Sequence, residues 1–99
     1  MIDGTYALEV DTPLGRKSGT IELITKGDEL RANLNAPIVG ERHGKGKVDG
    51  NMFTTGGSAK IPLLGTFEYT VQGEVMDDIL SATLHTSKGD FNVVGVRVA

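Results

Sequence analysis

Hydrophobic and polar residues alternate with a period of two along most of this chain. The clearest stretch covers residues 65–75, where one face carries Phe67, Tyr69, Val71 and Val75. Successive side chains of a β-strand point to opposite faces, so this alternation predicts a strand that is buried on one side. No segment sustains the period of an α-helix.

Turn-forming residues interrupt the alternation at regular intervals. Gly, Asn and Asp tolerate the positive φ of tight hairpins, and they recur in the pairs Gly27-Asp28, Gly50-Asn51 and Asp77-Asp78. Each pair precedes an alternating segment, so the three look like copies of one hairpin unit.

The turns separate eight predicted strands, at residues 3–11, 16–26, 29–36, 38–48, 51–58, 63–75, 79–87 and 90–98. Short connections favour pairing in chain order, and closing the sheet removes its exposed edges. We therefore predict an all-β fold, an eight-stranded antiparallel up-and-down meander barrel that forms one domain over residues 1–99.

Parity within the strands predicts which side chains fill the barrel. The inward set comprises Tyr6, Leu8, Val10, Ile21, Leu23, Leu30, Ala32, Leu34, Val48, Phe53, Phe67, Tyr69, Val71, Val75, Leu80, Ala82, Leu84, Phe91 and Val93. The fourth strand is the most open, because Gly40, Gly44 and Gly46 share its inward face with Arg42.

These glycines have two interpretations. Glycine in a strand permits bending and the close approach of neighbouring strands. Alternatively, the glycines leave a cavity of roughly a few hundred Å³, in which Arg42 offers its guanidinium to a ligand carboxylate. The candidate ligand-binding residues are then Arg42, Phe53, Phe67 and Tyr69.

The last predicted strand is apolar on both faces. Phe91 and Val93 fall on the inward face, and the other face carries Val94, Val96 and Val98. A stripe of apolar side chains on an outer face often marks a contact with another protein, so we predict that these valines form a homo-oligomer interface. The alternatives are a β-bulge that shifts the parity, or a strand that is covered on both faces.

Composition narrows the choice of partner and compartment. The chain has no cysteine, which excludes disulfides and zinc–thiolate sites and favours a reducing compartment, so we expect a cytoplasmic protein. The first residues do not resemble a signal peptide, and no apolar run is long enough to span a bilayer, so no membrane partner is expected. The formal net charge of −3 argues against nucleic acid as a partner.

No catalytic, cofactor or metal site is predicted. Glu41 and His43 share a face but supply only two ligands, whereas a catalytic zinc takes three from the protein. The glycines around Lys45 lack the spacing and the following helix of a phosphate-binding loop. An enzyme that uses His85 or Tyr69 at the barrel mouth stays open as an alternative, although the sequence shows no combination of a nucleophile, a base and a group that orients the base.

Both ends of the sequence resemble those of the calycins, the superfamily of lipocalins, fatty-acid-binding proteins and avidins. The first strand opens with Gly4-Thr5-Tyr6, similar to the Gly-x-Trp with which many such barrels begin. Arg97 stands in the place of the arginine that packs over that aromatic ring. The resemblance implies that Tyr6 and Arg97 meet across one end of the barrel as a cation–π pair that closes it.

More closely, the chain resembles a family of short bacterial lipocalin-like proteins, in its turns and strand ends at residues 11–15, 27–30, 48–51 and 95–97. This resemblance implies the barrel fold and, by analogy, ligand binding. We therefore expect a barrel that binds a small apolar or carboxylate-bearing molecule without catalysis. The alternative is a structural or interaction module that forms a homo-oligomer or docks on a partner protein.

Overall fold

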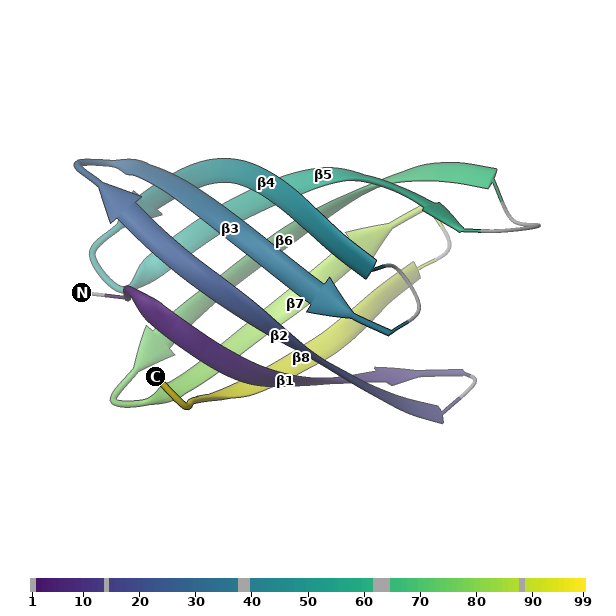
Figure 1. Ribbon diagram of the computed structural model, residues 1–99, viewed down its shortest axis with the longest axis horizontal. Coiled ribbons are helices and arrows are strands. Elements are labelled where there is room, and N and C mark those ends of the chain that lie inside the picture. Colours follow the sequence, from purple (N-terminus) through teal and green to yellow (C-terminus); the bar gives the residue numbers. More distant parts are fainter. Residues whose placement is uncertain (1, 14, 38–39, 62–64, 88) are drawn as a thin grey trace.

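The computed structural model describes residues 2–13, 15–37, 40–61, 65–87 and 89–99, without the side chains of 59–61 and 67. These residues form eight antiparallel strands that close into a barrel in chain order (Figure 1). The strands are β1 Gly4–Thr12, β2 Gly15–Lys26, β3 Glu29–Ala36, β4 Gly40–Asp49, β5 Met52–Ile61, β6 Gly65–Met76, β7 Ile79–Thr86 and β8 Gly89–Arg97. Pairing of β8 with β1 completes the circle, and the predicted meander barrel is confirmed.

Strand boundaries differ from the prediction mainly in β5. This strand continues to Ile61, past the predicted end at residue 58, because its backbone stays paired with β6 up to Ile61 opposite Gly65. The predicted beginnings of β4 and β6, at residues 38 and 63, lie outside the described residues. Within the described ranges, no helix is long and apolar enough to cross a membrane.

Three hairpin turns and both chain ends gather at one end of the barrel, on the left in Figure 1, which we call the closed end. The carbonyl of the second turn residue accepts a hydrogen bond from the strand that follows the hairpin. These bonds, each 2.9 Å, join Val48 N to Asp28 O, Val75 N to Asn51 O, and Arg97 N to Asp78 O. The three similar hairpin segments in the sequence therefore share one backbone hydrogen bond, which joins each turn to the strand after the hairpin.

The first residue of each of these turns has a left-handed backbone. Its φ is 63° at Gly27, 59° at Gly50 and 54° at Asp77. Glycine adopts this region without a steric cost, and aspartate is one of the few other residues that tolerate it. The turn chemistry predicted from Gly and Asp is thus the chemistry that the backbone requires.

The core follows the predicted parity and is densest near the closed end. Its buried apolar side chains are Ile2, Tyr6, Leu8, Ile21, Leu23, Leu30, Ala32, Phe53, Val75, Leu80 and Val93. A second group is only partly buried and packs against this core, namely Val10, Leu34, Val48, Val71, Ala82 and Leu84. The predicted inward residue Phe67 lies outside the described side chains.

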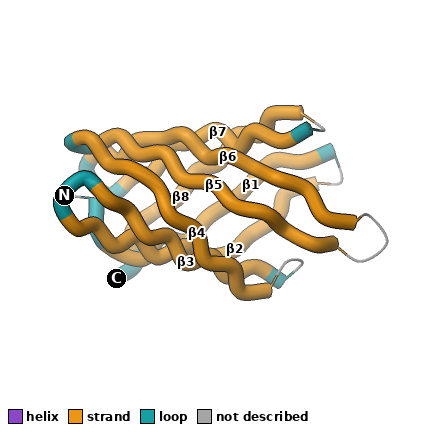
Figure 2. Tube along the Cα trace, turned by 90° about the horizontal axis from the view of Figure 1, so that it is seen from above, coloured by secondary structure: helices purple, strands orange, loops and turns teal. Residues whose placement is uncertain are grey.

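At the opposite end, which we call the open end, the barrel separates into four hairpins (Figure 2). Pairing between neighbouring hairpins reaches only to the pairs Thr20–Asn35, Lys45–Gly56, Tyr69–Thr86 and Val10–Val93 among the described residues. Beyond these pairs each strand is bonded to its own hairpin partner alone. Backbone pairing therefore closes the barrel less completely at this end.

Candidate functional site

A cavity of about 100 Å³ occupies the barrel interior. Its wall is apolar, with Leu8, Ile21, Leu34, Phe53 and Val71 among its residues, and its only polar side chains within the described part of the chain are Arg42, Thr55 and Tyr69. The volume is below the few hundred Å³ expected from the sequence. A cavity of about 150 Å³ in a protein core holds one benzene molecule, so this smaller one suits a short aliphatic chain, or a ring that enters it in part.

The inward glycines of β4 fit both interpretations, at different positions. A Cβ at Gly46 would lie 1.8 Å from the Thr54 carbonyl oxygen, so Gly46 is required for the close approach of β4 to β5. A Cβ at Gly44 would lie 2.9 Å from the Gly56 carbonyl oxygen, yet Gly44 also lines the cavity. Strand packing explains Gly46, and the cavity uses the space beside Gly44.

Arg42 is half-buried on the inward face of β4, at the open end of the cavity. Its Nη1 donates a hydrogen bond of 2.8 Å to the carbonyl oxygen of Glu41. Among the described residues this is its one hydrogen bond, and a guanidinium presents five donors in a planar fork, so Arg42 keeps donor capacity toward a ligand. Arg42 is the only charged side chain of the cavity wall among the described residues.

Tyr69 faces the same space from β6. Its ring lies over Gly57, where an added Cβ would be 3.1 Å from the Tyr69 hydroxyl oxygen. Burial raises the pKa of Tyr69, while the positive charge of Arg42 acts in the opposite direction. The phenol is therefore neutral at neutral pH and adds a hydroxyl donor beside the guanidinium.

Thr55 is the buried polar residue of the wall that the predicted inward set omits. Its Oγ1 donates a hydrogen bond of 3.2 Å to the carbonyl oxygen of Lys45, so the hydroxyl already has a partner. Its parity with Phe53 was the signal that could have placed it inside the barrel.

Of the four predicted ligand-binding residues, the structure brings Arg42, Phe53 and Tyr69 together around the cavity. Phe67 lies outside the described side chains. The arrangement offers an apolar compartment with a cation and a neutral hydroxyl at its entrance.

The closed end holds the predicted pair Tyr6 and Arg97. Arg97 Nη2 donates to the Tyr6 hydroxyl at 2.7 Å, and its guanidinium carbon lies 5.3 Å from the centre of the ring. That hydroxyl in turn donates to the carbonyl of Ile2 at 2.8 Å, and Arg97 Nη1 lies 2.8 Å from the carboxylate of Asp78. The hydrogen bond to Tyr6 raises the pKa of Arg97. These contacts join the first strand, the last strand and a turn, so they close the barrel.

Asp3 ties the N-terminal segment to β2 at the same end. Its carboxylate accepts hydrogen bonds from the backbone N–H of Thr25, at 3.0 Å, and from the hydroxyl of Thr25. Both bonds favour the ionised form and lower the pKa of Asp3 below its ordinary value.

The three valines of the predicted interface are exposed on the outer face, by 51% at Val94, 52% at Val96 and 61% at Val98. Strand register sets Val96 between Ile79 of β7 and Ala7 of β1, and sets Ile79 beside Met76 of β6. We call this row the apolar strip, consisting of Met76, Ile79, Val96 and Ala7. It crosses four strands, with Val94 and Val98 on its two sides.

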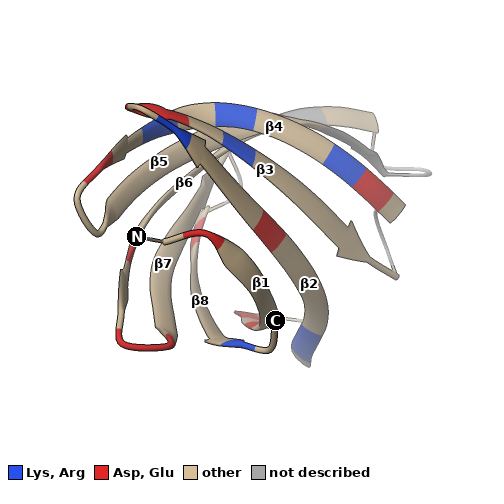
Figure 3. Cartoon of the chain, turned by 60° about the vertical axis from the view of Figure 1, so that its left-hand side comes forward, with Lys and Arg blue, Asp and Glu red and all other residues tan. Residues whose placement is uncertain are grey.

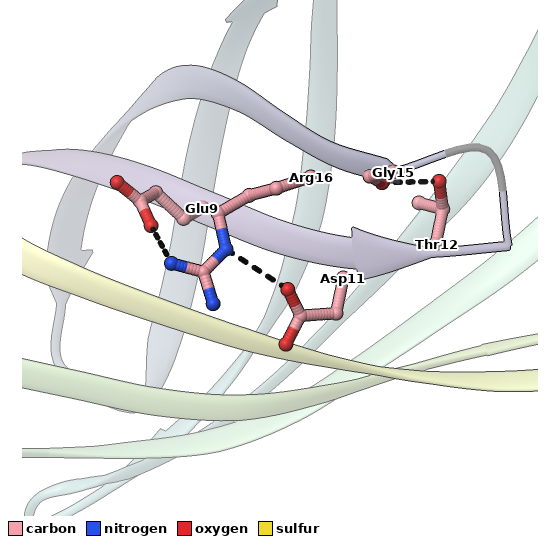
Figure 4. A network of polar contacts seen from close by, with 5 residues as sticks. All are labelled: Glu9, Asp11, Thr12, Gly15 and Arg16. Carbon is pink, nitrogen blue, oxygen red and sulfur yellow. Dashed lines mark hydrogen bonds and ion pairs between the residues drawn. The ribbon is translucent and has the colours of Figure 1, made fainter.

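The remaining polar clusters lie on the surface. Arg16 bridges the carboxylates of Glu9 at 2.9 Å and Asp11 at 3.0 Å, and the Thr12 hydroxyl donates to the Gly15 carbonyl (Figure 4). These contacts hold the β1–β2 hairpin. Exposed ion pairs of this kind contribute little to stability.

Both histidines have polar side-chain partners. His43 Nδ1 bonds to Asn33 at 2.7 Å, and His85 Nδ1 pairs with Asp90 at 2.9 Å. Throughout the described ranges, no group of three or more His, Cys, Asp or Glu residues could hold a metal ion.

No family model matches the chain, and no curated protein sequence matches it. Its structure is similar to that of a redesigned β barrel, with a TM-score of 0.67 and 17% sequence identity over 99% of this chain and 92% of the other. It is also similar to a de novo designed fluorescence-activating β barrel, with a TM-score of 0.60 and 15% identity over 97% of this chain and 93% of the other. At these identities the likeness concerns the fold. The class defined here is an eight-stranded antiparallel barrel with a small interior cavity.

Proposed function

We propose that the barrel binds a small apolar molecule that carries a carboxylate, and that it does so without catalysing a reaction. The cavity with Arg42 and Tyr69 at its entrance is the observation that carries this proposal. Small-molecule sites are mostly apolar, with a few polar groups that fix orientation. Arginine binds carboxylates through two parallel hydrogen bonds. The apolar part of the ligand would fill the cavity, and its carboxylate would stay at the open end.

The comparison with known structures supports this proposal. One of the similar structures is a designed fluorescence-activating barrel, and an interior ligand site would fit that likeness. Membership of a lipocalin-like bacterial family is part of the proposal, supported by Gly4, Tyr6 and Arg97 at the closed end. A cytoplasmic location is proposed on the lack of cysteine.

Titration of the protein with benzoate and with benzyl alcohol, followed by NMR of backbone amides, tests the proposal. The two molecules share a ring and differ in charge. We expect saturable shifts at Ala32, Leu34 and Val71 with benzoate, and a Kd on the order of 0.1–1 mM at about 0.5 kcal/mol per non-hydrogen atom. Benzyl alcohol should bind at least about tenfold more weakly, since it lacks the charge-assisted pair.

The matched variants are Arg42→Gln and Arg31→Gln. Arg42→Gln should remove the preference for benzoate, whereas Arg31, which is exposed on β3, should be replaceable without effect. Equal binding of benzoate to the protein and to Arg42→Gln would contradict the proposal, as would a lack of saturable shifts with both molecules.

Self-association through the apolar strip is the second candidate. Beside the strip runs an open groove of about 750 Å³, whose walls are Ile79, Val94 and Val96 on one side and Thr20, Asn35 and Pro37 on the other. A ridge and a groove on one face are self-complementary, because a two-fold axis can set each ridge into the groove of a second copy. Apolar patches of this kind commonly mark such contacts.

Sedimentation velocity over a range of protein concentrations tests this candidate. We expect a dimer that the Val96→Lys variant converts to a monomer. Ile24→Lys is the matched control, because Ile24 is also exposed but lies on β2, away from the strip. A monomeric protein at high concentration, or equal effects of the two variants, would contradict self-association.

A further inference from the structure

β4 and β5 part from one another at the open end although both continue as strands. They pair from Asp49–Met52 to Lys45–Gly56. Beyond that point, residues 40–44 stay paired with β3 and residues 57–61 stay paired with β6. Figures 1 and 2 both show the ends of the two strands diverging. We call this place the β4–β5 seam, and each strand presents a backbone edge to it.

Side chains donate hydrogen bonds to two carbonyls of β4, one at the last β4–β5 pair and one beyond it. The Lys45 carbonyl accepts a hydrogen bond from Thr55 Oγ1, and the Glu41 carbonyl accepts one from Arg42 Nη1. Alternate residues of a strand direct their backbone groups to the same side, so His43, which lies between these two, has its backbone N–H and carbonyl directed toward the seam as well. A β-strand is the ligand that such an edge recognises.

Glycines lie on both strands of the seam. Gly44 still lies against Gly56, and above it the edges bear Gly40 on one strand and Gly57 and Ser58 on the other. An added Cβ at Gly40 would meet no atom within 4 Å. Glycine within strands commonly marks a site where another backbone approaches closely.

The cavity and its polar groups adjoin this seam. Arg42 belongs to the β4 edge, and the Tyr69 ring covers Gly57 of the β5 edge. Lys and Arg also follow the outer faces of β3 and β4 (Figure 3), among them Arg31 and Lys45. Glu41 lies next to Arg42 on β4, so the charge that favours an incoming carboxylate is that of Arg42, which lines the cavity.

We propose that the β4–β5 seam binds the C-terminal strand of an extended peptide. This inference rests on the proposed function and names the source of the carboxylate. A peptide N–H would replace Arg42 as the donor to the Glu41 carbonyl, and the released guanidinium would pair with the terminal carboxylate. The last side chain would enter the cavity, whose volume of about 100 Å³ suits one aliphatic side chain. The C-terminal residue of a peptide carries a backbone N–H for β4, a carboxylate for Arg42 and an apolar side chain for the cavity.

The probe is the peptide Thr-Val-Thr-Val-Thr-Leu, prepared as the free acid and as the C-terminal amide. We expect the acid to bind at least about tenfold more tightly, as for a charge-assisted pair. On binding, the amide protons of Glu41 and His43 on the β4 edge should become protected from exchange. Two further free acids, each N-methylated at one of two successive amides, test which side of the peptide strand pairs with β4. Successive amides point to opposite sides of a strand, so only one of the two can donate to β4. One methylation should abolish binding, and the other should preserve it.

Three results would overturn the binding of a peptide strand at the seam. The first is equal binding of the acid and the amide, and the second is equal binding of both N-methylated acids. The third is protection of the same amides that grows with protein concentration in the absence of peptide, because a second copy of the protein would then occupy the seam. If benzoate binds through Arg42 while no peptide binds, the seam inference fails and the proposed function stands. If neither benzoate nor peptide binds, both fail.

Discussion

The two ends of this barrel are built from the same strands but treat their polar and apolar groups differently. At the closed end, the turn carbonyls of Asp28, Asn51 and Asp78 receive backbone N–H groups. At the open end, the strand carbonyl of Glu41, beyond the last β4–β5 pair, receives the side chain of Arg42. The closed end therefore has its hydrogen bonds built into the fold, whereas a ligand can replace this one at the open end.

Side chains are also more deeply buried at the closed end than at the open end. Tyr6, Leu23, Leu30 and Leu80 are among the largest fully buried side chains. Leu34 and Leu84 follow Leu30 and Leu80 by four residues on the same strands and are only partly buried. Binding sites are commonly drawn from the less stable parts of a structure, because the groups that bind must be able to rearrange. The contrast indicates that stability resides at one end and recognition at the other.

The largest expected difference lies within β3, between Leu30→Ala and Leu34→Ala. Leu30 is 1% exposed, so its truncation should cost about 3 kcal/mol of unfolding free energy through lost burial and a new void. Leu34 borders the cavity and is partly exposed, so its truncation should cost about 1 kcal/mol. Urea denaturation of both variants measures these costs. Equal costs would show that the two ends are packed alike.

A smaller difference is expected between Tyr6→Phe and Tyr69→Phe. The Tyr6 hydroxyl joins Arg97 to the Ile2 carbonyl, and its removal should cost about 1–2 kcal/mol. The Tyr69 hydroxyl is at the cavity entrance, so Tyr69→Phe should leave stability within about 0.5 kcal/mol and weaken benzoate binding. The same denaturation experiment and the benzoate titration test the pair. A destabilising Tyr69→Phe that binds benzoate normally would reverse the assignment.

The smallest expected effect depends on pH and arises from Asp3. Its folded pKa lies below its ordinary value of 3.8 because Thr25 donates two hydrogen bonds to the ionised carboxylate. This contribution is therefore fully present above the unfolded pKa and is lost as the pH falls through the folded pKa. The gap in stability between the protein and Asp3→Asn should be constant near neutral pH and shrink in acid.

Thermal unfolding of both proteins from pH 7 down to pH 2 measures this gap. Asp49→Asn, at an exposed carboxylate of the closed end, is the matched control. A gap for Asp3→Asn that does not change with pH would mean that the contacts with Thr25 do not favour the charged form.

Sequence reasoning reached the fold because a period of two assigns each side chain to a face without reference to any other strand. Tyr6, Leu30 and Leu80 are inside for this reason. The contact between Tyr6 and Arg97, which the resemblance to calycins implied, is present in the structure. Ile2 was missed, because it precedes the first alternating residue yet its side chain is buried at the closed end.

The features of the site that were missed depend on register between strands. Gly46 is needed because of Thr54, and Gly57 is covered by Tyr69. Neither relation is visible in the pattern of one strand. The place where Lys45–Gly56 pairing stops, and hence the β4–β5 seam, likewise follows from how the strands twist and separate. The sequence predicted the cavity as one alternative and overestimated its volume.

Hydrogen exchange of the native protein, followed amide by amide by NMR, tests the contrast between the two ends most directly. Amides of Val48, Val75 and Arg97, which donate to the closed-end turns, should exchange at least about a hundredfold more slowly than those of Glu41 and His43 at the β4–β5 seam. This result would place the stable unit and the recognition site at opposite ends of the same strands. Equal protection at the two ends would contradict the account, since the seam would then already be closed.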